Sequence, residues 1–317
     1  MQGRWQRGRD PSPHKPSLTV IMPVLDQKNV LKGLTVAEAM RRQVIAVSSD
    51  APLEKAIRFS IKYKVNAIVV TDADQRALGV VTKTDLMGAY YAELPLETSV
   101  ETIMVGPPLF CRQDDSLDVA LDTMRAQRIH RLYVHGEEPE RVVGVLAYPD
   151  IVGLLYRFCR RCDRSILKKA DGQSEGDLAG HLTVREVMTP GVESFPEKAS
   201  LVEVMAGLSA NRLAAVLIQG TAGQPLGVVS KTDLILAYKH GLPQETPARE
   251  VMNAPVRTCR RDDYLALAIQ EMIFWDIHRV FVAQGETQEI VGVLSLSDAA
   301  RFRSGTCRAC LVSRIAV

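Results

Sequence analysis

An internal duplication constrains the fold of this chain more than any other feature of its sequence. Residues 34–162 align with residues 182–310 at a constant offset of 148 positions, and the alignment needs no gap. The pattern Leu-Thr-Val-x-Glu-x-Met occurs at residues 34–40 and recurs at residues 182–188. A duplication of this length predicts that the chain contains two copies of one structural module.

Each half contains a second, looser repeat. Asp85 and Asp150 lie 65 positions apart, and so do Asp233 and Asp298. Each of these aspartates closely follows a Gly-Val-Val or Gly-Val-Leu run. The chain of 317 residues is therefore expected to contain four units of about 60 residues each.

The apolar pattern predicts the same order of helices and strands in the units. In the first unit we expect a short helix that ends near Met40, a strand over 44–47, a helix over 53–63, strands over 65–70 and 78–82, and a last helix. Thr84 is expected to cap that last helix, and Asp85 suits the positive end of its dipole. A unit of this size cannot bury its sheet alone, so neighbouring units are expected to pair.

Seven segments are expected in chain order. They are a mobile basic N-terminal arm (1–30), a first unit (31–92), a second unit (93–160), a linker (161–180), a third unit (181–240), a fourth unit (241–303) and a C-terminal tail with a Cys-x-x-Cys pair (304–317). The arm is rich in Arg, Pro, Gly and Ser and cannot build a core. The linker is polar and has few apolar residues.

The overall composition excludes several classes of protein. The formal net charge of +2 gives no broad electrostatic field for nucleic acid, so DNA or RNA is not expected as a partner despite the basic arm. No apolar run approaches the roughly 20 residues that span a bilayer, so we expect no membrane partner and a cytoplasmic location. Six cysteines in a chain of this length are typical of a reducing compartment rather than of a secreted disulfide scaffold.

These motifs resemble those of the CBS domain, whose pairs are called Bateman modules. The resemblance rests on the opening Thr-Val-x-x-x-Met, the Leu-x-x-Ala in the middle and the closing Gly-Val-Val-Thr-x-Thr-Asp, and it covers residues 34–302. It implies an α/β (α+β) fold of four CBS domains, each a small sheet with two main helices, paired into two Bateman modules with pseudo-twofold symmetry. The four-unit layout is similar to that of the gamma subunits of AMP-activated protein kinase, and stand-alone bacterial CBS proteins are equally compatible with it.

The resemblance also implies a ligand site at the closing motif. In CBS proteins that bind adenosine compounds, the motif aspartate holds the ribose diol and nearby hydroxyls contact ribose or phosphate. An ionised carboxylate suits this task because it only accepts hydrogen bonds, and the glycines are expected to allow close approach of the base. The alternatives are helix capping for the hydroxyl and acidic residues and a solvated position for the lysines. The candidate residues are Thr35, Gly79, Thr82, Lys83, Thr84, Asp85, Thr183, Gly227, Ser230, Lys231, Thr232, Asp233, Ser295, Ser297 and Asp298.

Two His-Arg pairs are candidates for phosphate contacts, because the kinase gamma subunits present His-Arg to nucleotide phosphates at this position. The pairs are His130-Arg131 and His278-Arg279. We expect one charged pocket in each half, formed by Asp85 with the first pair and by Asp233 with the second. The alternative for each histidine is a packed core position. The remaining acid, Asp150, follows residues 147–149 that lack a hydroxyl motif, so its site is expected to be empty or weak.

Two Cys-x-x-Cys pairs follow the modules and lie outside the CBS pattern. They are Cys159 with Cys162 and Cys307 with Cys310. Four thiolates could form a tetrahedral zinc site if the pairs meet within the chain or across a dimer. Neighbouring arginines would favour a thiol-disulfide switch instead. A third alternative is that both tails were duplicated with their modules and have no special role.

The expected function is that of a non-catalytic regulatory sensor, since the sequence contains no Walker loop, no His-Glu-x-x-His and no nucleophile elbow. The expected ligand is an adenine nucleotide (AMP, ADP or ATP) in the clefts between paired units, where binding would change the domain arrangement or the oligomeric state. S-adenosylmethionine or NAD is the alternative ligand. A zinc- or redox-dependent assembly protein is the alternative function. The expected protein partners are a second copy of the chain, forming a homodimer, or a regulated protein.

Overall fold

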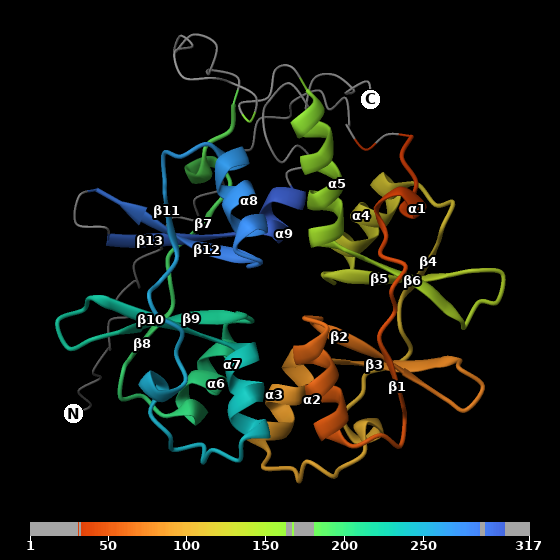
Figure 1. Cartoon of the computed structure of the whole chain (residues 1–317), viewed down its shortest axis with the longest axis horizontal. Coiled ribbons are helices and arrows are strands. Elements are labelled where there is room, and N and C mark those ends of the chain that lie inside the picture. Colours follow the sequence, from red (N-terminus) through yellow and green to blue (C-terminus); the bar gives the residue numbers. More distant parts are fainter. Residues whose placement is uncertain (1–30, 32, 163–166, 168–180, 286–288, 302–317) are drawn as a thin grey trace, which may run out of the picture.

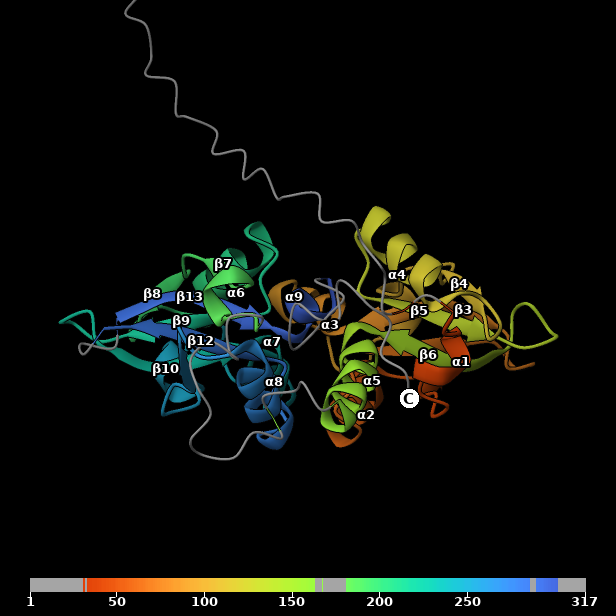
Figure 2. The ribbon, with the colours of Figure 1, turned by 90° about the horizontal axis from the view of Figure 1, so that it is seen from above.

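The computed structural model describes residues 31, 33–162, 167, 181–285 and 289–301. Within these residues the chain forms four similar units around a common centre (Figure 1). Units 1 and 2 come from the first half of the chain and units 3 and 4 from the second half, and the two halves lie side by side (Figure 2). A single chain thus supplies both modules of the ring.

The first half contains five α-helices and six strands among its described residues. The helices are α1 (Val36–Ala39), α2 (Leu53–Lys62), α3 (Lys83–Tyr91), α4 (Leu117–Ala126) and α5 (Tyr148–Arg161), with a 3-10 turn η1 (Val100–Thr102). The strands are β1 (Ala46–Ser48), β2 (Ala67–Thr71), β3 (Ala77–Thr82), β4 (Phe110–Arg112), β5 (Arg131–His135) and β6 (Val142–Ala147).

The second half repeats this order. Its α-helices are α6 (Leu201–Ala210), α7 (Lys231–Lys239), α8 (Leu265–Phe274) and α9 (Leu296–Arg301), with 3-10 turns η4 (Val184–Glu186) and η5 (Ala248–Glu250). Its strands are β7 (Thr189–Pro190), β8 (Ser194–Pro196), β9 (Ala215–Gln219), β10 (Pro225–Ser230), β11 (Thr258–Arg260), β12 (Arg279–Gln284) and β13 (Glu289–Ser295).

Each unit is built on one small sheet, as the sequence predicts. The strand orders are β1-β2-β3, β4-β5-β6, β10-β9-β8 and β11-β12-β13-β7. In every sheet the first main strand runs parallel to the second, and the third runs antiparallel to it. The α/β fold class is therefore confirmed. Four small mixed sheets, each covered by helices, match the expected architecture.

The cap of the last helix in unit 1 differs from the prediction. Thr82, not Thr84, is the N-cap of α3, and its hydroxyl accepts hydrogen bonds from the Thr84 and Asp85 backbone N–H groups. Asp85 at the third helical position returns a bond to the Thr82 backbone N–H at 2.7 Å. This reciprocal arrangement, a capping box, satisfies donors at the start of the helix from both sides.

The opening segments of the units are exchanged between partners. Thr35 forms a β-bridge with Ser116 of unit 2, and Pro52 forms one with Ser99, which opens unit 2. The second half repeats both contacts, through Thr183 with Tyr264 and Ser200 with Pro247. The opening segment of each unit therefore packs on its neighbour, in agreement with the expectation that the units pair.

The hydrophobic core also crosses the boundary between the two halves. One buried cluster joins units 2 and 4, and includes Leu121, Ile151, Ile269 and Leu294. A second cluster joins units 1 and 3. Because apolar burial dominates the free energy of folding, the two halves are expected to unfold together rather than as independent modules.

No helix in the described part of the chain combines the length and the apolar composition that a membrane span requires.

Candidate functional site

The four motif aspartates occupy the same place, at the third position of a helix that starts near the centre. One oxygen of each carboxylate, Oδ2, accepts a hydrogen bond from the backbone N–H three residues earlier, at 2.7–2.9 Å. The acids and their helices are Asp85 in α3, Asp150 in α5, Asp233 in α7 and Asp298 in α9. Capping therefore engages Oδ2 in all four units and leaves Oδ1 to other partners.

The predicted hydroxyl residues fall into two groups. Thr82, Ser230 and Ser295 donate from their hydroxyls to the Oδ2 atoms of Asp85, Asp233 and Asp298, each at 2.7 Å. They position the acids. Thr84 and Thr232 lie one residue before Asp85 and Asp233, and their hydroxyls accept hydrogen bonds from lysines of the opposite half. Ser297 is half-buried in α9.

Two lysines cross between the halves of the chain. Nζ of Lys83 donates to Oγ1 of Thr232, and Nζ of Lys231 donates to Oγ1 of Thr84, both at 2.8 Å. The lysine of each half thus lies at the acid-bearing helix of the other half. Both lysines are half-buried, and their role in ligand binding stays a prediction.

The environment of these lysines opposes their charge. Burial lowers the pKa of Lys83 to about 8, with a further lowering by Arg131 and an opposing effect of Asp233. Burial and Arg279 also lower the pKa of Lys231, while Asp85 raises it. An anion bound beside these lysines would stabilise their charged form, because it would offset the repulsion between neighbouring cations.

The His-Arg pairs add to this positive centre. Arg131 and Arg279 start β5 and β12, and the preceding histidines are exposed. Partial burial is the main cause that lowers the pKa of both histidines. The next largest cause is Arg301 for His130 and Lys83 for His278. Both histidines are exposed as whole residues although their surroundings partly desolvate the imidazoles, and a phosphate contact of these side chains stays a prediction.

The charges of the two halves interact more widely than the expected pockets imply. Lys231 and Arg279 of the second half help to lower the pKa of His130 in the first half. Likewise, Lys83 and Arg41 of the first half help to lower the pKa of His278 in the second half. Each arginine also interacts electrostatically with the acid of its own unit. Arg131 lowers the pKa of Asp150, and Asp298 raises the pKa of Arg279. The positive centre is therefore shared by the whole chain rather than divided into one pocket per half.

Two of the four acids also have a side-chain partner at Oδ1, and the sequence did not suggest either partner. Nε of Arg41 pairs with Oδ1 of Asp150 at 2.8 Å, and the Asp150 side chain is only 8% exposed. Nδ2 of Asn253 donates to Oδ1 of Asp233 at 2.7 Å. In both cases the partner directly follows an opening methionine, a position at which the residue differs in all four units.

A small cavity lies beside the ion pair of Arg41 with Asp150. Its volume is about 10 Å³, enough for one water molecule, and it is lined by Arg41, Arg131, Tyr133 and apolar residues of both units. Tyr133 is itself buried, and the charge of Arg131 acts on its hydroxyl. A nucleoside needs a pocket of several hundred Å³, so this cavity is too small for one.

The motif glycines have a packing role that the sequence did not suggest. A Cβ atom on Gly79 would lie 2.9 Å from the Val105 carbonyl oxygen, and one on Gly227 would lie 2.8 Å from the Asn253 carbonyl oxygen. Gly144 and Gly292 meet the other two opening segments in the same way. The glycines allow close approach of the neighbouring unit's own backbone, whereas their expected contact with a base stays a prediction.

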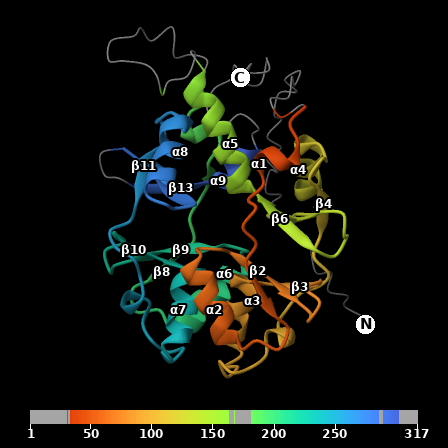
Figure 3. The ribbon, with the colours of Figure 1, turned by 45° about the vertical axis from the view of Figure 1, so that its right-hand side comes forward.

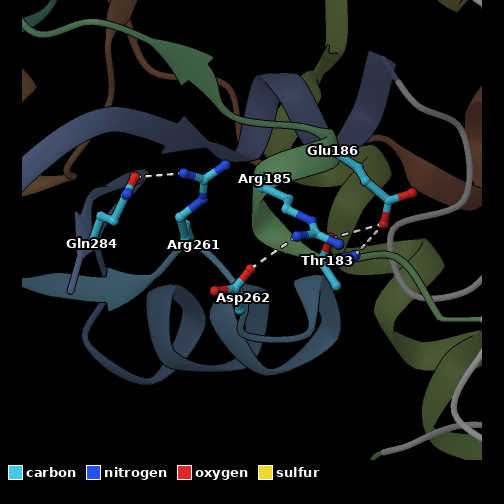
Figure 4. Close-up of polar contacts among 6 residues, drawn as sticks. All are labelled: Thr183, Arg185, Glu186, Arg261, Asp262 and Gln284. Atoms are coloured by element: carbon cyan, nitrogen blue, oxygen red, sulfur yellow. Dashed lines mark hydrogen bonds and ion pairs between the residues drawn. The ribbon is translucent and has the colours of Figure 1, made fainter.

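The opening threonines act as helix caps. Thr183 donates from its backbone N–H and its hydroxyl to Oε2 of Glu186, at 2.8 and 2.9 Å (Figure 4). Thr35 repeats this arrangement with Glu38. Figure 4 also shows Arg185 reaching Asp262, which ties the opening of unit 3 to unit 4. A ligand contact of these threonines stays a prediction.

The zinc or redox site can be followed only in part. Cys159 is buried in α5, and Cys162 is partly buried at the end of this helix. Cys307 and Cys310 lie outside the described residues. Within the described part of the chain no group of three or more His, Cys, Asp or Glu side chains could hold a metal ion.

Comparison with known families identifies all four repeats. The family model described as the CBS domain matches residues 36–92, 100–157, 184–240 and 248–305. The gamma-3 subunits of 5'-AMP-activated protein kinase from Bos taurus and Homo sapiens are 23% and 24% identical over 92% of this chain. The chain spans 61% and 62% of the length of these two relatives.

Solved structures share the four-unit arrangement. A Methanocaldococcus jannaschii protein, described as a candidate archaeal homologue of the kinase gamma subunit, has a TM-score of 0.70 at 14% identity, over 85% of this chain and 99% of that one. A conserved protein from Pyrococcus horikoshii has a TM-score of 0.56 at 16% identity, over 85% of this chain and 100% of that one. At these identities the likeness concerns the fold.

Proposed function

Because the chain belongs to the CBS domain family and carries four CBS domains, we propose that it is a non-catalytic regulatory sensor of adenine nucleotides. AMP, ADP or ATP would bind in the clefts between paired domains, with ribose on the motif aspartates and phosphates toward the centre. Binding would change the domain arrangement or the oligomeric state, and a regulated partner protein or a second copy of the chain would read that change.

The observation that carries this proposal is the convergence of cations from both halves beside the motif acids. Lys83, Lys231, Arg131 and Arg279 are partly buried, and three of them have a lowered pKa because burial opposes their charge. No carboxylate among the described residues forms an ion pair with these four side chains within 4.0 Å. Such a centre favours a polyanion, and the adjacent carboxylates suit the neutral diol of its sugar.

The same charges discriminate between the adenosine compounds considered. S-adenosylmethionine carries a sulfonium cation and an ammonium group, which like-charge repulsion at this centre would disfavour. NAD carries a diphosphate but also a positively charged nicotinamide ring. AMP, ADP and ATP carry only negative charge, so the proposal ranks them above NAD and above S-adenosylmethionine.

A thermal-shift screen of the full chain against AMP, ADP, ATP, NAD and S-adenosylmethionine tests this ranking, followed by calorimetry on the ligands that raise the melting temperature. A ligand that binds only the folded chain stabilises it by an amount that grows with its concentration over Kd. An adenine nucleotide should give the largest shift. A larger shift with S-adenosylmethionine, or none with any nucleotide at millimolar concentration, would contradict the proposal.

A further inference from the structure

We propose that the residue directly after each opening methionine determines whether the facing aspartate can bind a ligand; this inference rests on the proposed function. The residues at this position, called here the facing position, are Arg41, Val105, Thr189 and Asn253. Arginine closes the site, asparagine occupies one carboxylate oxygen with a neutral donor, and valine or threonine leaves that oxygen open.

The backbone places these four residues in one register. Arg41 exchanges two backbone hydrogen bonds with Val145, both at 2.9 Å, and Val105 exchanges two with Val80, at 2.9 and 2.8 Å. Asn253 does the same with Val228, and Thr189 pairs with Val293. Each of these valines lies five positions before a motif aspartate, so the facing position has the same backbone relation to each acid.

The side chain at the facing position decides what happens to Oδ1. Arg41 binds Oδ1 of Asp150 at 2.8 Å, and Oδ2 is held by the Ala147 backbone N–H at 2.8 Å. Both oxygens of this carboxylate therefore have internal donors. A ribose would have to displace a partly buried ion pair, and breaking one side of such a pair is costly.

Asp233 is an intermediate case. Asn253 donates to its Oδ1 at 2.7 Å, but the amide is neutral and its residue is exposed. A hydrogen bond from a neutral amide to a carboxylate at the surface is weaker than an ion pair, and a ribose hydroxyl that replaces the amide makes a bond of the same kind to the carboxylate. Asn253 can also reorient toward the ligand, because its amide offers both donors and an acceptor.

Asp85 and Asp298 are the open cases. Val105 has no polar side-chain atom and is 59% exposed, and Thr189 is also exposed. No other described side chain donates to Oδ1 of either acid. Within one module the acids of units 1 and 2 therefore differ chiefly in the residue that faces them, valine for Asp85 and arginine for Asp150.

The closing experiment moves the arginine to an open site. In the full chain, Val105→Arg should pair with Asp85, and calorimetry with AMP should show the loss of one binding equivalent relative to the unmodified chain. Val105→Met is the matched control, because it adds a side chain of similar length without charge, and it should retain the equivalent. Thr189→Arg repeats the test at Asp298, and circular dichroism checks that each variant folds.

The outcomes separate this inference from the proposed function. If the unmodified chain binds no adenine nucleotide, both fail. If it binds AMP and both arginine variants keep the full number of equivalents, only the facing-position rule fails. Equal losses in the arginine and methionine variants would also overturn the rule, because bulk alone would then explain them. A crystal structure of unliganded Val105→Arg should show the new ion pair with Asp85, and an arginine that points elsewhere would count against the rule.

Discussion

Units 1 and 3 meet along one edge of the ring, through α3 and α7, whereas units 2 and 4 meet along the other edge, through α5 and α9 (Figure 3). At the first edge the rings of Tyr90 and Tyr238 stack with centroids 5.2 Å apart and an interplanar angle of 14°. Each hydroxyl donates to a backbone carbonyl of the opposite half, at Leu242 and Leu94. We call this stacked pair, Tyr90 and Tyr238, the tyrosine clasp. Both of its hydroxyl groups have hydrogen-bond acceptors.

The second edge lacks such a clasp among its described residues. The Tyr148 hydroxyl is buried without a hydrogen-bond partner, and Arg301 lies over the Tyr148 ring at 5.4 Å. His130 meets the same ring edge-on at 5.7 Å. Because an incompletely satisfied, cation-rich edge is less stable than a satisfied one, a ligand-driven rearrangement should concentrate between units 2 and 4.

The largest expected effect comes from removing one ring of the tyrosine clasp. Tyr90→Ala should lower the free energy of unfolding by about 3–5 kcal/mol, since it leaves a cavity and removes a stacked pair. Tyr90 is 4% exposed, so little of this cost can be relieved by solvent. Urea unfolding followed by circular dichroism measures the change. A loss below 1 kcal/mol would show that the clasp is not the firm edge.

Loss of a ligand-facing acid should come next, and it should affect binding rather than folding. Asp233→Ala removes the proposed partner of the ribose and should weaken AMP or ATP at that site by about 1.5–3 kcal/mol. Calorimetry of the full chain measures the affinity. Asp150→Ala is the matched control and should leave nucleotide affinity unchanged, because Arg41 already holds that carboxylate. Unchanged affinity in Asp233→Ala would contradict the ribose contact.

The affinity for phosphates should depend on pH through Lys83. In the free protein the pKa of Lys83 is about 8, and a bound phosphate would raise it. Binding then takes up a proton above that pH, so affinity should fall about tenfold between pH 7 and pH 9. The histidines act in the same direction at lower pH, because their free pKa values are lowered and phosphate would raise them.

Lys83→Met tests this assignment. Its affinity should be weaker at pH 7, and it should decline less between pH 7 and pH 9 than the affinity of the unmodified chain. The free variant should be at least as stable as the unmodified chain, because the substitution removes a charge that burial opposes. A parallel decline in both proteins would assign the pH dependence to another group.

The smallest expected effects come from replacing one tyrosine by phenylalanine at each of the two edges. Tyr90→Phe removes a hydroxyl that donates to the Leu242 carbonyl at 2.7 Å and should cost about 1 kcal/mol. Tyr148→Phe removes a buried hydroxyl without a partner and should be neutral or slightly stabilising. Thermal unfolding of both variants measures the difference. Equal costs at both edges would remove the contrast between them.

Much of the fold could be predicted because its signals are local or repeated. The strand predicted over 78–82 is β3 at Ala77–Thr82, and the helix predicted over 53–63 is α2 at Leu53–Lys62. Alternating apolar residues and helical spacing mark such elements without reference to the rest of the chain. The cap was misassigned by two residues, since Thr82 and Thr84 are chemically equivalent and only the backbone geometry selects between them.

The residues that meet at the centre could be predicted in their types but not in their pairings, and their contact with a ligand stays a prediction. The acids, hydroxyls, lysines and His-Arg pairs were identified because they recur at repeat positions. Arg41 and Asn253 were missed because neither is a repeated residue: the equivalent positions hold threonine and valine. Their roles appear only when the opening segment of one unit is placed against the motif of the next.

The amino-acid sequence alone determined the four repeats, the order of elements within them and the position of each acid at a helix start, since capping and apolar periodicity act over a few residues. The tertiary structure decided which lysine reaches which helix, which acid is closed by an arginine, and which edge of the ring is locked by tyrosines. These contacts join residues such as Lys83 and Thr232, 149 positions apart. They depend on how the two halves dock, and no local pattern encodes that docking.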